Sequence, residues 1–545
     1  MKLKKYLHLL CYLALILICA GVVYLLGELG GSHSGTGKET EHSAQTPEES
    51  TEDTEAGETS QPETEESSEG FSEGSDDSET ENGEAGQEES YEAWLSDVLK
   101  RNLQKGSTGG KKRGTGTKNG KAETSESEGE ETTEEYVPPT IMVVSDLHYM
   151  SGTTHDDGTA FWKMVANDDG KTSQYSDFLM DALADTVLEK MPSALVLTGD
   201  ITLNGERENH EKLAERLRAI QDAGIPVVVI PGNHDISNKN SATYFGIEKE
   251  EAEYLHSGEE FYEIYHEFGF DQSPNRDPSS LSYVYPVDAE HWLLMLDSCQ
   301  YENGNKVGGR IRPETLTWLG VHLRVAQEHG IEVLPMAHHN LLSESRMYTS
   351  ECTLENTYDT VNLLESYQVP LYISGHLHAE RIKKHKPEPG TSADDYGVSE
   401  IVMPPFSIPA CQYGVLSWDT EGGMHFETEK LDVEAYARKV GSTDEHLLNF
   451  STWSPKFVKE IIKNQVMKTI TLVPDDLKEE MAGLYADLYY DYCCGNQMSW
   501  EPVRATAGYK LWQRVLPDNV YTKRIAQMIE DVREDLHTWD SPASK

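Results

Sequence analysis

The sequence predicts a layered α/β domain, followed by a helical region and preceded by a membrane anchor and a disordered linker. Apolar, β-branched runs alternate with helical segments over residues 138–431, which is typical of a largely parallel sheet covered by helices on both faces. Residues 432–545 carry mainly helical patterns, and residues 28–137 lack the apolar side chains that a core requires. The predicted boundaries are therefore 1–27, 28–137, 138–431 and 432–545.

Residues 1–27 have the pattern of a single-pass membrane anchor. Lysines precede about 20 apolar residues, Tyr6 to Leu26, which is enough for a helix to cross a bilayer. Lysines mark the cytoplasmic flank, so the remainder of the chain is predicted to lie outside the cytoplasm. An uncleaved anchor is favoured because the apolar run exceeds the usual core of a signal peptide. Secretion after signal cleavage is the alternative.

Residues 28–137 predict a disordered acidic linker. They consist largely of Glu, Ser, Thr and Gly, and much of the formal net charge of -49 lies there. The charge therefore describes the linker more than the folded part, and it argues against a nucleic acid polymer as a partner. In the stretch 91–103, apolar residues recur at helical spacing. This short amphipathic helix either docks on the folded part or on a partner, or forms only transiently.

Five predicted strands end in polar residues that can bind metal. These residues are Asp146 and His148; Asp200; Asn233, His234 and Asp235; His338 and His339; and His376 and His378. One such cluster is explained by a turn, but five of them at the strand ends, where α/β sheets bind ligands, indicate a metal site. Mixed carboxylate, amide and imidazole ligands suit Mn, Fe or Zn, and the absence of thiolates argues against a structural zinc site.

The ligands are numerous enough for two divalent metal ions. Two ions about 3.5–4 Å apart can share a bridging carboxylate and a bridging hydroxide. The hydroxide is then a nucleophile at neutral pH, and the ions hold the oxygens of a phosphoester during displacement at phosphorus. The predicted chemistry is hydrolysis of a small phosphoester substrate.

The ordered motifs DLH, GDITLNGE, GNHD, AHHN and GHLH resemble those of the calcineurin-like metallophosphoesterase superfamily. The phrases NRDPSSLSYVY, GGRIRPETLTWL and DVEAYARKVGSTDEHLLNF are similar to the bacterial class III cyclic nucleotide phosphodiesterases. The resemblance implies a four-layer αββα sandwich, in which two mixed sheets are flanked by helices. It also implies a helical C-terminal domain beside the active site.

The same resemblance implies a role for each polar residue. Asp146, His148 and His378 would bind the first metal, Asn233, His338 and His376 would bind the second, and Asp200 would bridge them. His234 would assist the leaving oxygen as a general acid or phosphate clamp, oriented by Asp235 or another nearby acid. An exchange of roles between His338 and His339 stays open. Asn204 and Glu206 are candidates to hydrogen-bond to the metal ligands and hold them in place.

Two segments leave alternatives for their aromatic residues. Phe261, Tyr262, Tyr265 and Phe268 recur at helical spacing, which predicts a helix packed on the core; a lid or pocket wall is the alternative. The aromatic residues of the C-terminal helices predict the core of a bundle. Shaping a substrate pocket, or contact with another copy of the chain in a homo-oligomer, is the second interpretation.

Together these features predict a membrane-anchored, extracytoplasmic, two-metal phosphodiesterase. Its expected substrates are cyclic nucleotides or similar small phosphodiesters, and its nucleophile is a metal-bridging hydroxide. A broad-specificity phosphomonoesterase or nucleotidase that scavenges phosphate is the enzymatic alternative. A surface-anchored, envelope-binding protein is the non-enzymatic alternative, against which the intact ligand set argues.

Overall fold

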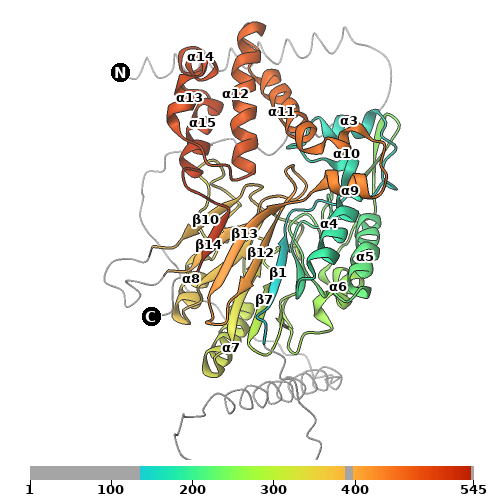
Figure 1. Cartoon of the computed structure of the whole chain (residues 1–545), viewed down its shortest axis with the longest axis vertical. Coiled ribbons are helices and arrows are strands. Elements are labelled where there is room, and N and C mark those ends of the chain that lie inside the picture. The colour runs from blue at the N-terminus through green and yellow to red at the C-terminus, as the bar shows by residue number, and fades with distance from the viewer. Residues whose placement is uncertain (1–135, 387–396, 542–545) are drawn as a thin grey trace, which may run out of the picture. The chain divides into compact units, whose positions relative to one another are not determined.

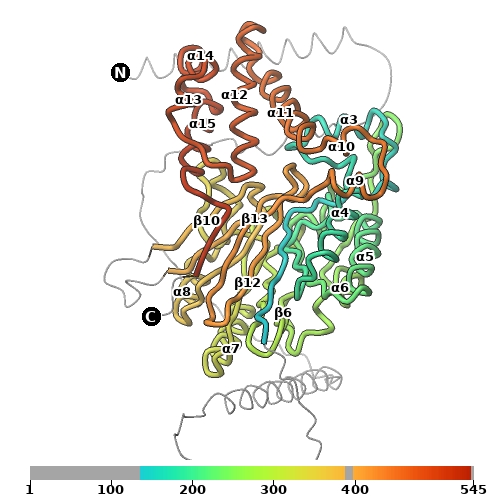
Figure 2. Tube along the Cα trace, in the orientation of Figure 1, coloured from blue at the N-terminus to red at the C-terminus, as the bar shows by residue number. Residues whose placement is uncertain are grey.

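The computed structural model describes residues 136–386 and 397–541 of the chain (Figure 1 and Figure 2). The predicted anchor, the amphipathic stretch 91–103 and nearly all of the predicted linker lie outside these residues. Within the described ranges, no helix is both long and apolar enough to cross a bilayer.

A six-stranded mixed sheet contains the first three strands of the described chain and the last three. Its order is β14-β13-β12-β1-β2-β3, and β1, β2 and β3 run parallel to one another. The other three are added antiparallel. The strands are β1 (Thr140–Val144), β2 (Ala194–Thr198), β3 (Val227–Ile230), β12 (Gln412–Trp418), β13 (Met424–Lys430) and β14 (Thr538–Asp540).

A second six-stranded sheet has the order β10-β11-β9-β8-β7-β6. Strands β7, β8, β9 and β11 are parallel, and β6 and β10 are antiparallel edges. The strands are β6 (Tyr283–Pro286), β7 (His291–Leu296), β8 (Glu332–Ala337), β9 (Leu371–Ser374), β10 (Arg381–Lys384) and β11 (Ser399–Val402). The largely parallel arrangement predicted from the alternation of strands and helices therefore holds for β1, β2 and β3, which form one half of the first sheet, and for β7, β8, β9 and β11 of the second sheet. The other strands are antiparallel to the neighbours with which they pair.

The strands of the second sheet bury side chains on both faces. In β7, Leu293 and Met295 join the core that contains the first sheet, whereas Leu294 and Leu296 join a separate core. That separate core includes α7 (Pro313–His329) and α8 (Thr357–Ser366). The first sheet packs with α4 (Ser176–Lys190), α5 (Arg207–Asp222) and α6 (Gly258–Tyr265), on the opposite side (Figure 1). This is the αββα layering that the resemblance implies.

The segment between β3 and β6 packs on the first core. It contains the hairpin of β4 (Ala242–Phe245) and β5 (Glu248–Glu251), followed by α6 and the turn η2 (His266–Phe270). Phe261, Tyr265 and Phe268 are fully buried. The core-packing interpretation of this aromatic stripe is therefore the one that the structure supports.

The C-terminal region is helical. Its first two helices pack on the core of the first sheet, and the later helices share another core with side chains that follow β9 and lie in β11. Its helices are α9 (Val433–Lys439), α10 (Glu445–Leu448), α11 (Phe450–Thr469), α12 (Asp475–Cys493), α13 (Trp500–Ala505), α14 (Ala507–Val515) and α15 (Val520–Asp531). Tyr485 and Tyr489 are buried, and the buried Trp512 donates from Nε1 to the carbonyl oxygen of Met481 at 2.7 Å. The predicted helical region does not extend to the end of the chain, because Thr538–Asp540 returns to the first sheet as β14 and pairs with β13.

Candidate metal centre

The seven residues predicted to bind metal converge at the carboxyl ends of strands from both sheets. Asp146 and His148 follow β1, Asp200 follows β2, Asn233 follows β3, His338 follows β8, and His376 and His378 follow β9. All are buried except the two histidines after β9, which are half-buried. The topology of the two sheets thus places these five strand ends at one site.

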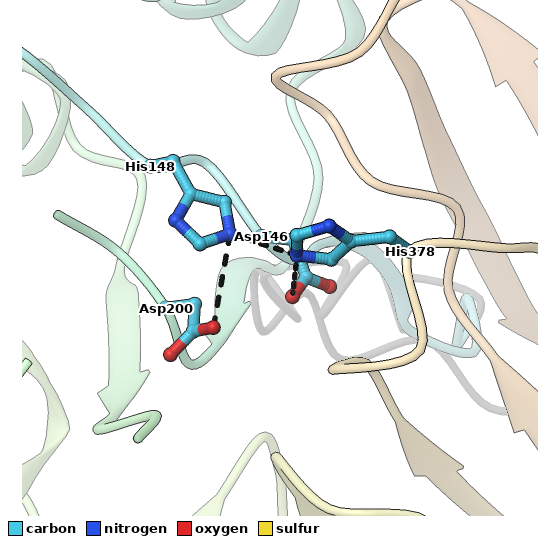
Figure 3. A group of neighbouring side chains, drawn as sticks. All are labelled: Asp146, His148, Asp200 and His378. Carbon is cyan, nitrogen blue, oxygen red and sulfur yellow. Dashed lines mark hydrogen bonds and ion pairs between the residues drawn. The ribbon is translucent and has the colours of Figure 1, made fainter. Parts of the chain in front are cut away.

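Four of these residues face one another as the first group of potential ligands (Figure 3). Asp146, His148, Asp200 and His378 each offer one ligand atom, and these atoms all lie within 4.8 Å of one another. His148 Nε2 is 2.9 Å from His378 Nε2 and 3.7 Å from Asp200 Oδ2. His378 Nε2 is also 3.5 Å from Asp146 Oδ1.

A second group of potential ligands shares Asp200 with the first. Asp200, His338 and His376 again have ligand atoms within 4.8 Å of one another. His338 Nε2 lies 3.3 Å from Asp200 Oδ2 and 3.2 Å from Asn233 Oδ1. Asp200 is therefore the residue that would contact both cations if each group bound one.

Backbone carbonyl oxygens orient the two histidines of the second group. His338 Nδ1–H donates to the carbonyl oxygen of Thr198 at 3.0 Å, which leaves Nε2 to face Asp200. His376 Nε2–H donates to the carbonyl oxygen of Glu351 at 2.9 Å, which leaves Nδ1. Fixing one ring nitrogen as a donor presents the other as a lone pair, as in most metal-binding histidines.

Asp169 is a functional candidate that the sequence reasoning missed. It follows helix α3 (Thr159–Val165), and its Oδ2 accepts a hydrogen bond from His378 Nδ1 at 2.5 Å. The buried Lys171 donates to the other carboxylate oxygen, Oδ1, at 2.6 Å. The run NDDGK (167–171) follows no strand, so its pattern is that of an ordinary polar loop.

The backbone at the site is held in an unusual conformation. The dihedral φ is positive at Asp146 (52°), His148 (41°), Asp200 (46°), His376 (69°) and His378 (54°). Non-glycine residues adopt this left-handed region rarely, and such strain persists where the surrounding packing over-determines it, often at functional sites. Close approach adds to the constraint, since a Cβ on Gly375 would lie 1.8 Å from Ser145 Oγ.

The charge states of the site suit a cation. Burial alone would raise the pKa of Asp200, but the facing imidazoles of His338 and His234 hold this pKa well below its usual range. Burial lowers the pKa of His148 well below its ordinary value and that of His376 to about 4. Burial opposes the charge of His338 and His378 as well, but facing carboxylates raise the pKa of His338 to about 9 and that of His378 to about 10. These two imidazoles therefore carry protons that a bound cation would displace.

The donor set fits two divalent ions. The seven side chains supply carboxylate oxygens, one amide oxygen and imidazole nitrogens, which are ligands of Mn, Fe and Zn. His378 Nε2 points at His148 Nε2 over 2.9 Å, a distance at which two lone pairs repel unless a proton or a cation lies between them. The arrangement is therefore that of a binuclear metal centre.

Comparison with known proteins agrees with this geometry. Residues 139–380 match the family model of the calcineurin-like phosphoesterases. The chain carries a calcineurin-like phosphoesterase domain. This confirms the superfamily that the ordered motifs indicated. The helical region, over residues 432–535, matches the model of the C-terminal domain of cyclic nucleotide phosphodiesterase.

Individual relatives are distant. A probable cyclic nucleotide phosphodiesterase of Psychrobacter arcticus is 24% identical over 251 residues, which are 45% of this chain and 76% of that protein. A dimetal phosphatase from Danio rerio is 14% identical with a TM-score of 0.39, over 54% of this chain and 97% of the other. A purple acid phosphatase from yellow lupin is 13% identical with a TM-score of 0.36, over 54% of this chain and 52% of the other.

His234 lies at the open side of the phosphoesterase site. Its side chain is 32% exposed, and its Nε2 is 3.9 Å from Asp200 Oδ2. Its Nδ1–H donates to the carbonyl oxygen of Leu203 at 2.8 Å and lies 3.1 Å from Asn204 Oδ1. The imidazole is thereby oriented with Nε2 toward the ligands.

The prediction that Asp235 orients His234 is wrong. The carboxylate of Asp235 is fully buried and accepts hydrogen bonds from the backbone N–H groups of Ile201, Thr202 and Gly232. A buried carboxylate needs such donors to offset the loss of hydration, and here they tie together the turns after β2 and β3. Asp235 therefore shapes the loops that carry Asp200 and Asn233.

The neighbouring histidines of the AHHN motif differ in their contacts. Both ring nitrogens of His339 have protein partners: Nε2 lies 2.8 Å from the carbonyl oxygen of Val307, and Nδ1 lies 2.8 Å from Ser298 Oγ. His338, in contrast, directs Nε2 at Asp200. The structure therefore favours His338 over His339 as the ligand.

Proposed function

We propose that this protein is a two-metal phosphodiesterase that cleaves cyclic nucleotides or similar small phosphodiesters. The observation that carries the proposal is the sharing of Asp200 by two groups of potential ligands. The preference for diesters is supported by the match of residues 432–535 to the C-terminal domain of cyclic nucleotide phosphodiesterase. The similarity to the Psychrobacter arcticus protein supports it as well.

The residues divide between the two ions as follows. Asp146, His148 and His378 would hold one ion, Asn233, His338 and His376 the other, and Asp200 both. When bound, two divalent cations supply a hydroxide nucleophile at neutral pH and neutralise charge on the phosphate. His234 presents Nε2 on the same side as Asp200, where it can hold the proton that the leaving oxygen takes up.

We propose further that the catalytic domain lies outside the cytoplasm and is anchored by residues 1–27. The lysine-flanked run of about 20 apolar residues supports this location. A protease added to intact cells should then degrade the catalytic domain while a cytosolic marker protein survives. Survival of both proteins until the membrane is disrupted would contradict the proposed location.

A comparison of substrates tests the proposed reaction. The full chain, purified in detergent and supplied with Mn, should cleave bis-p-nitrophenyl phosphate faster than p-nitrophenyl phosphate, and EDTA should abolish both activities. The opposite order of rates would favour the phosphomonoesterase alternative. A panel of 2′,3′- and 3′,5′-cyclic nucleotides, nucleoside monophosphates and cell-envelope phosphodiesters then identifies the substrate class.

A further inference from the structure

We propose that Asp169 positions the metal ligand His378, and that the C-terminal helical region holds the loop that carries Asp169. The inference rests on the proposed role of His378 in metal binding. It assigns a task in the catalytic centre to helix α11, which supplies none of the seven predicted ligands.

Asp169 holds the His378 ring from the side opposite the metal site. Its Oδ2 accepts from His378 Nδ1 at 2.5 Å, while His378 Nε2 faces His148 and Asp146. A carboxylate in this position selects the tautomer with the lone pair on Nε2, fixes the plane of the ring and strengthens the nitrogen as a ligand. Asp169 would touch no reacting atom, so it is a positioning residue.

Lys171 holds Asp169 in turn. Its ammonium group is buried and donates to Asp169 Oδ1 at 2.6 Å and to Asp168 Oδ1 at 2.9 Å. A buried cation between two carboxylates compensates charges that would otherwise be costly to remove from water. The carboxylate of Asp169 is thus fixed through both oxygens, one on Lys171 and one on His378.

Helix α11 contacts the loop 166–172 at two points. Gln465 Nε2 donates to the carbonyl oxygen of Asp168 at 2.7 Å and to that of Ala166 at 3.3 Å. Gly170 has φ of 106°, and a Cβ there would lie 2.7 Å from Val458 Cγ1. One face of α11 therefore holds the loop on both sides of Asp169.

Metal binding, measured apart from catalysis, tests the role of Asp169. Metal-free full-length protein is titrated with Mn by calorimetry. Asp169→Ala should weaken one of the two binding events by about 10- to 100-fold and leave the other unchanged. Asp169→Asn keeps an acceptor oxygen and should recover most of the loss. Wild-type affinity for both ions in Asp169→Ala would overturn the proposal.

A matched pair of variants on α11 tests the link to the helical region. Gln465→Glu places a negative acceptor against two carbonyl oxygens, so it should weaken the same binding event several-fold. Asn464→Asp makes the same chemical change at the neighbouring exposed position and should leave both events unchanged. Equal affinities in the two variants would refute the link.

Further measurements distinguish a variant that fails to fold from a variant that folds but binds metal more weakly. The unfolding midpoint of each metal-free variant is compared with that of the wild type, and Gln465→Ala replaces Gln465→Glu if the latter does not fold. Gln465→Ala should still lower the affinity for one ion, because the loop loses both hydrogen bonds. A wild-type chain that binds no Mn would contradict the proposed function and this inference together; unchanged variants contradict only the inference.

Discussion

At the scale of single residues, Asp200 is the residue that both groups of potential ligands share. Its Oδ2 is 3.3 Å from His338 Nε2 and 3.7 Å from His148 Nε2, so one carboxylate serves both groups of ligands. The carboxylate is also buried, which makes its charge more effective than that of a surface acid. Removal of this charge should therefore affect both metal positions at once.

We expect Asp200→Asn to lower turnover of bis-p-nitrophenyl phosphate by more than about 100-fold. Loss of a ligand that serves both ions should lower activity more than loss of a residue that only hydrogen-bonds to a ligand, which typically costs about 10- to 100-fold. The far-UV circular dichroism spectrum should stay that of the wild type. Asp222→Asn, at the exposed end of α5, is the matched control and should keep full activity. Activity retained in Asp200→Asn would refute the bridging role.

A buried pair of glutamates predicts a pH-dependent stability. Burial raises the pKa of Glu400 to about 7. Burial, together with the charge of Glu400, raises the pKa of Glu344 well above its usual value. Both pKa values are higher in the folded protein than in the unfolded chain, so the folded protein binds these protons more tightly. Protonation of the pair therefore stabilises the folded state. That contribution to stability is lost as pH rises through about 7.

We therefore expect the free energy of unfolding in EDTA to fall between about pH 5 and about pH 8 by on the order of 1–3 kcal/mol more in the wild type than in Glu344→Gln. Urea denaturation at several pH values measures the difference. Parallel pH dependences of the two proteins would show that the pair does not titrate in this way.

At the scale of elements, the end of β9 explains how neighbouring histidines reach different groups of ligands. The strand ends at Ser374, so His376 and His378 lie in the following turn, and both have positive φ. His376 then joins His338, whereas His378 joins His148. Because the strand has already ended, the two-residue period of a strand does not govern where these side chains point.

Gly375 makes this turn possible because a larger side chain there would collide with Ser145. Gly375→Ala should destabilise the domain by about 1–3 kcal/mol and weaken binding of Mn, because its Cβ would overlap Ser145 Oγ, beside the ligand Asp146. Gly483→Ala in α12 is the control: a Cβ there meets nothing within 4 Å and should be neutral or stabilising. Thermal unfolding and calorimetry measure both effects, and wild-type values for Gly375→Ala would contradict the prediction.

At the scale of the whole molecule, the helical region is joined to the phosphoesterase domain at several places. Its last residues form β14 on the first sheet, where Trp539 packs against the first core. Ile382 of β10 packs against both that core and the core of the bundle. Gln465 of α11 binds the loop behind His378. We therefore expect the described part of the chain to unfold as one cooperative unit.

Trp539→Ala tests this cooperativity. It should lower the free energy of unfolding by about 1–3 kcal/mol, since a partly buried ring is removed from the core, and it should do so in a single transition. Trp539→Phe should cost less because it keeps an aromatic ring. A calorimetric trace with two separate transitions, of which only one shifts, would show that the two regions unfold independently.

The sequence by itself determined which residues could form the site. Apolar strands that end in Asp, Asn and His identify ten candidate side chains, and the family resemblance selects seven of them as metal ligands. The structure brings these seven together, because the carboxyl ends of strands from both sheets meet at one site. The same local patterns predicted alternating strands and helices followed by a helical region, whereas the sandwich of two sheets was implied only by the family resemblance. The strands and helices depend on short-range periodicity, which the sequence displays directly.

Only the tertiary structure decided the contacts between distant segments. Asp169 and His378 are 209 positions apart, and nothing in the loop around Asp169 marks it as their meeting point. Asp235 stands next to His234 in the chain, yet its carboxylate turns to backbone amides instead. Strand β14 returns to the first sheet after the helical bundle. Such contacts leave no local pattern, because they depend on which surfaces meet once the elements have packed.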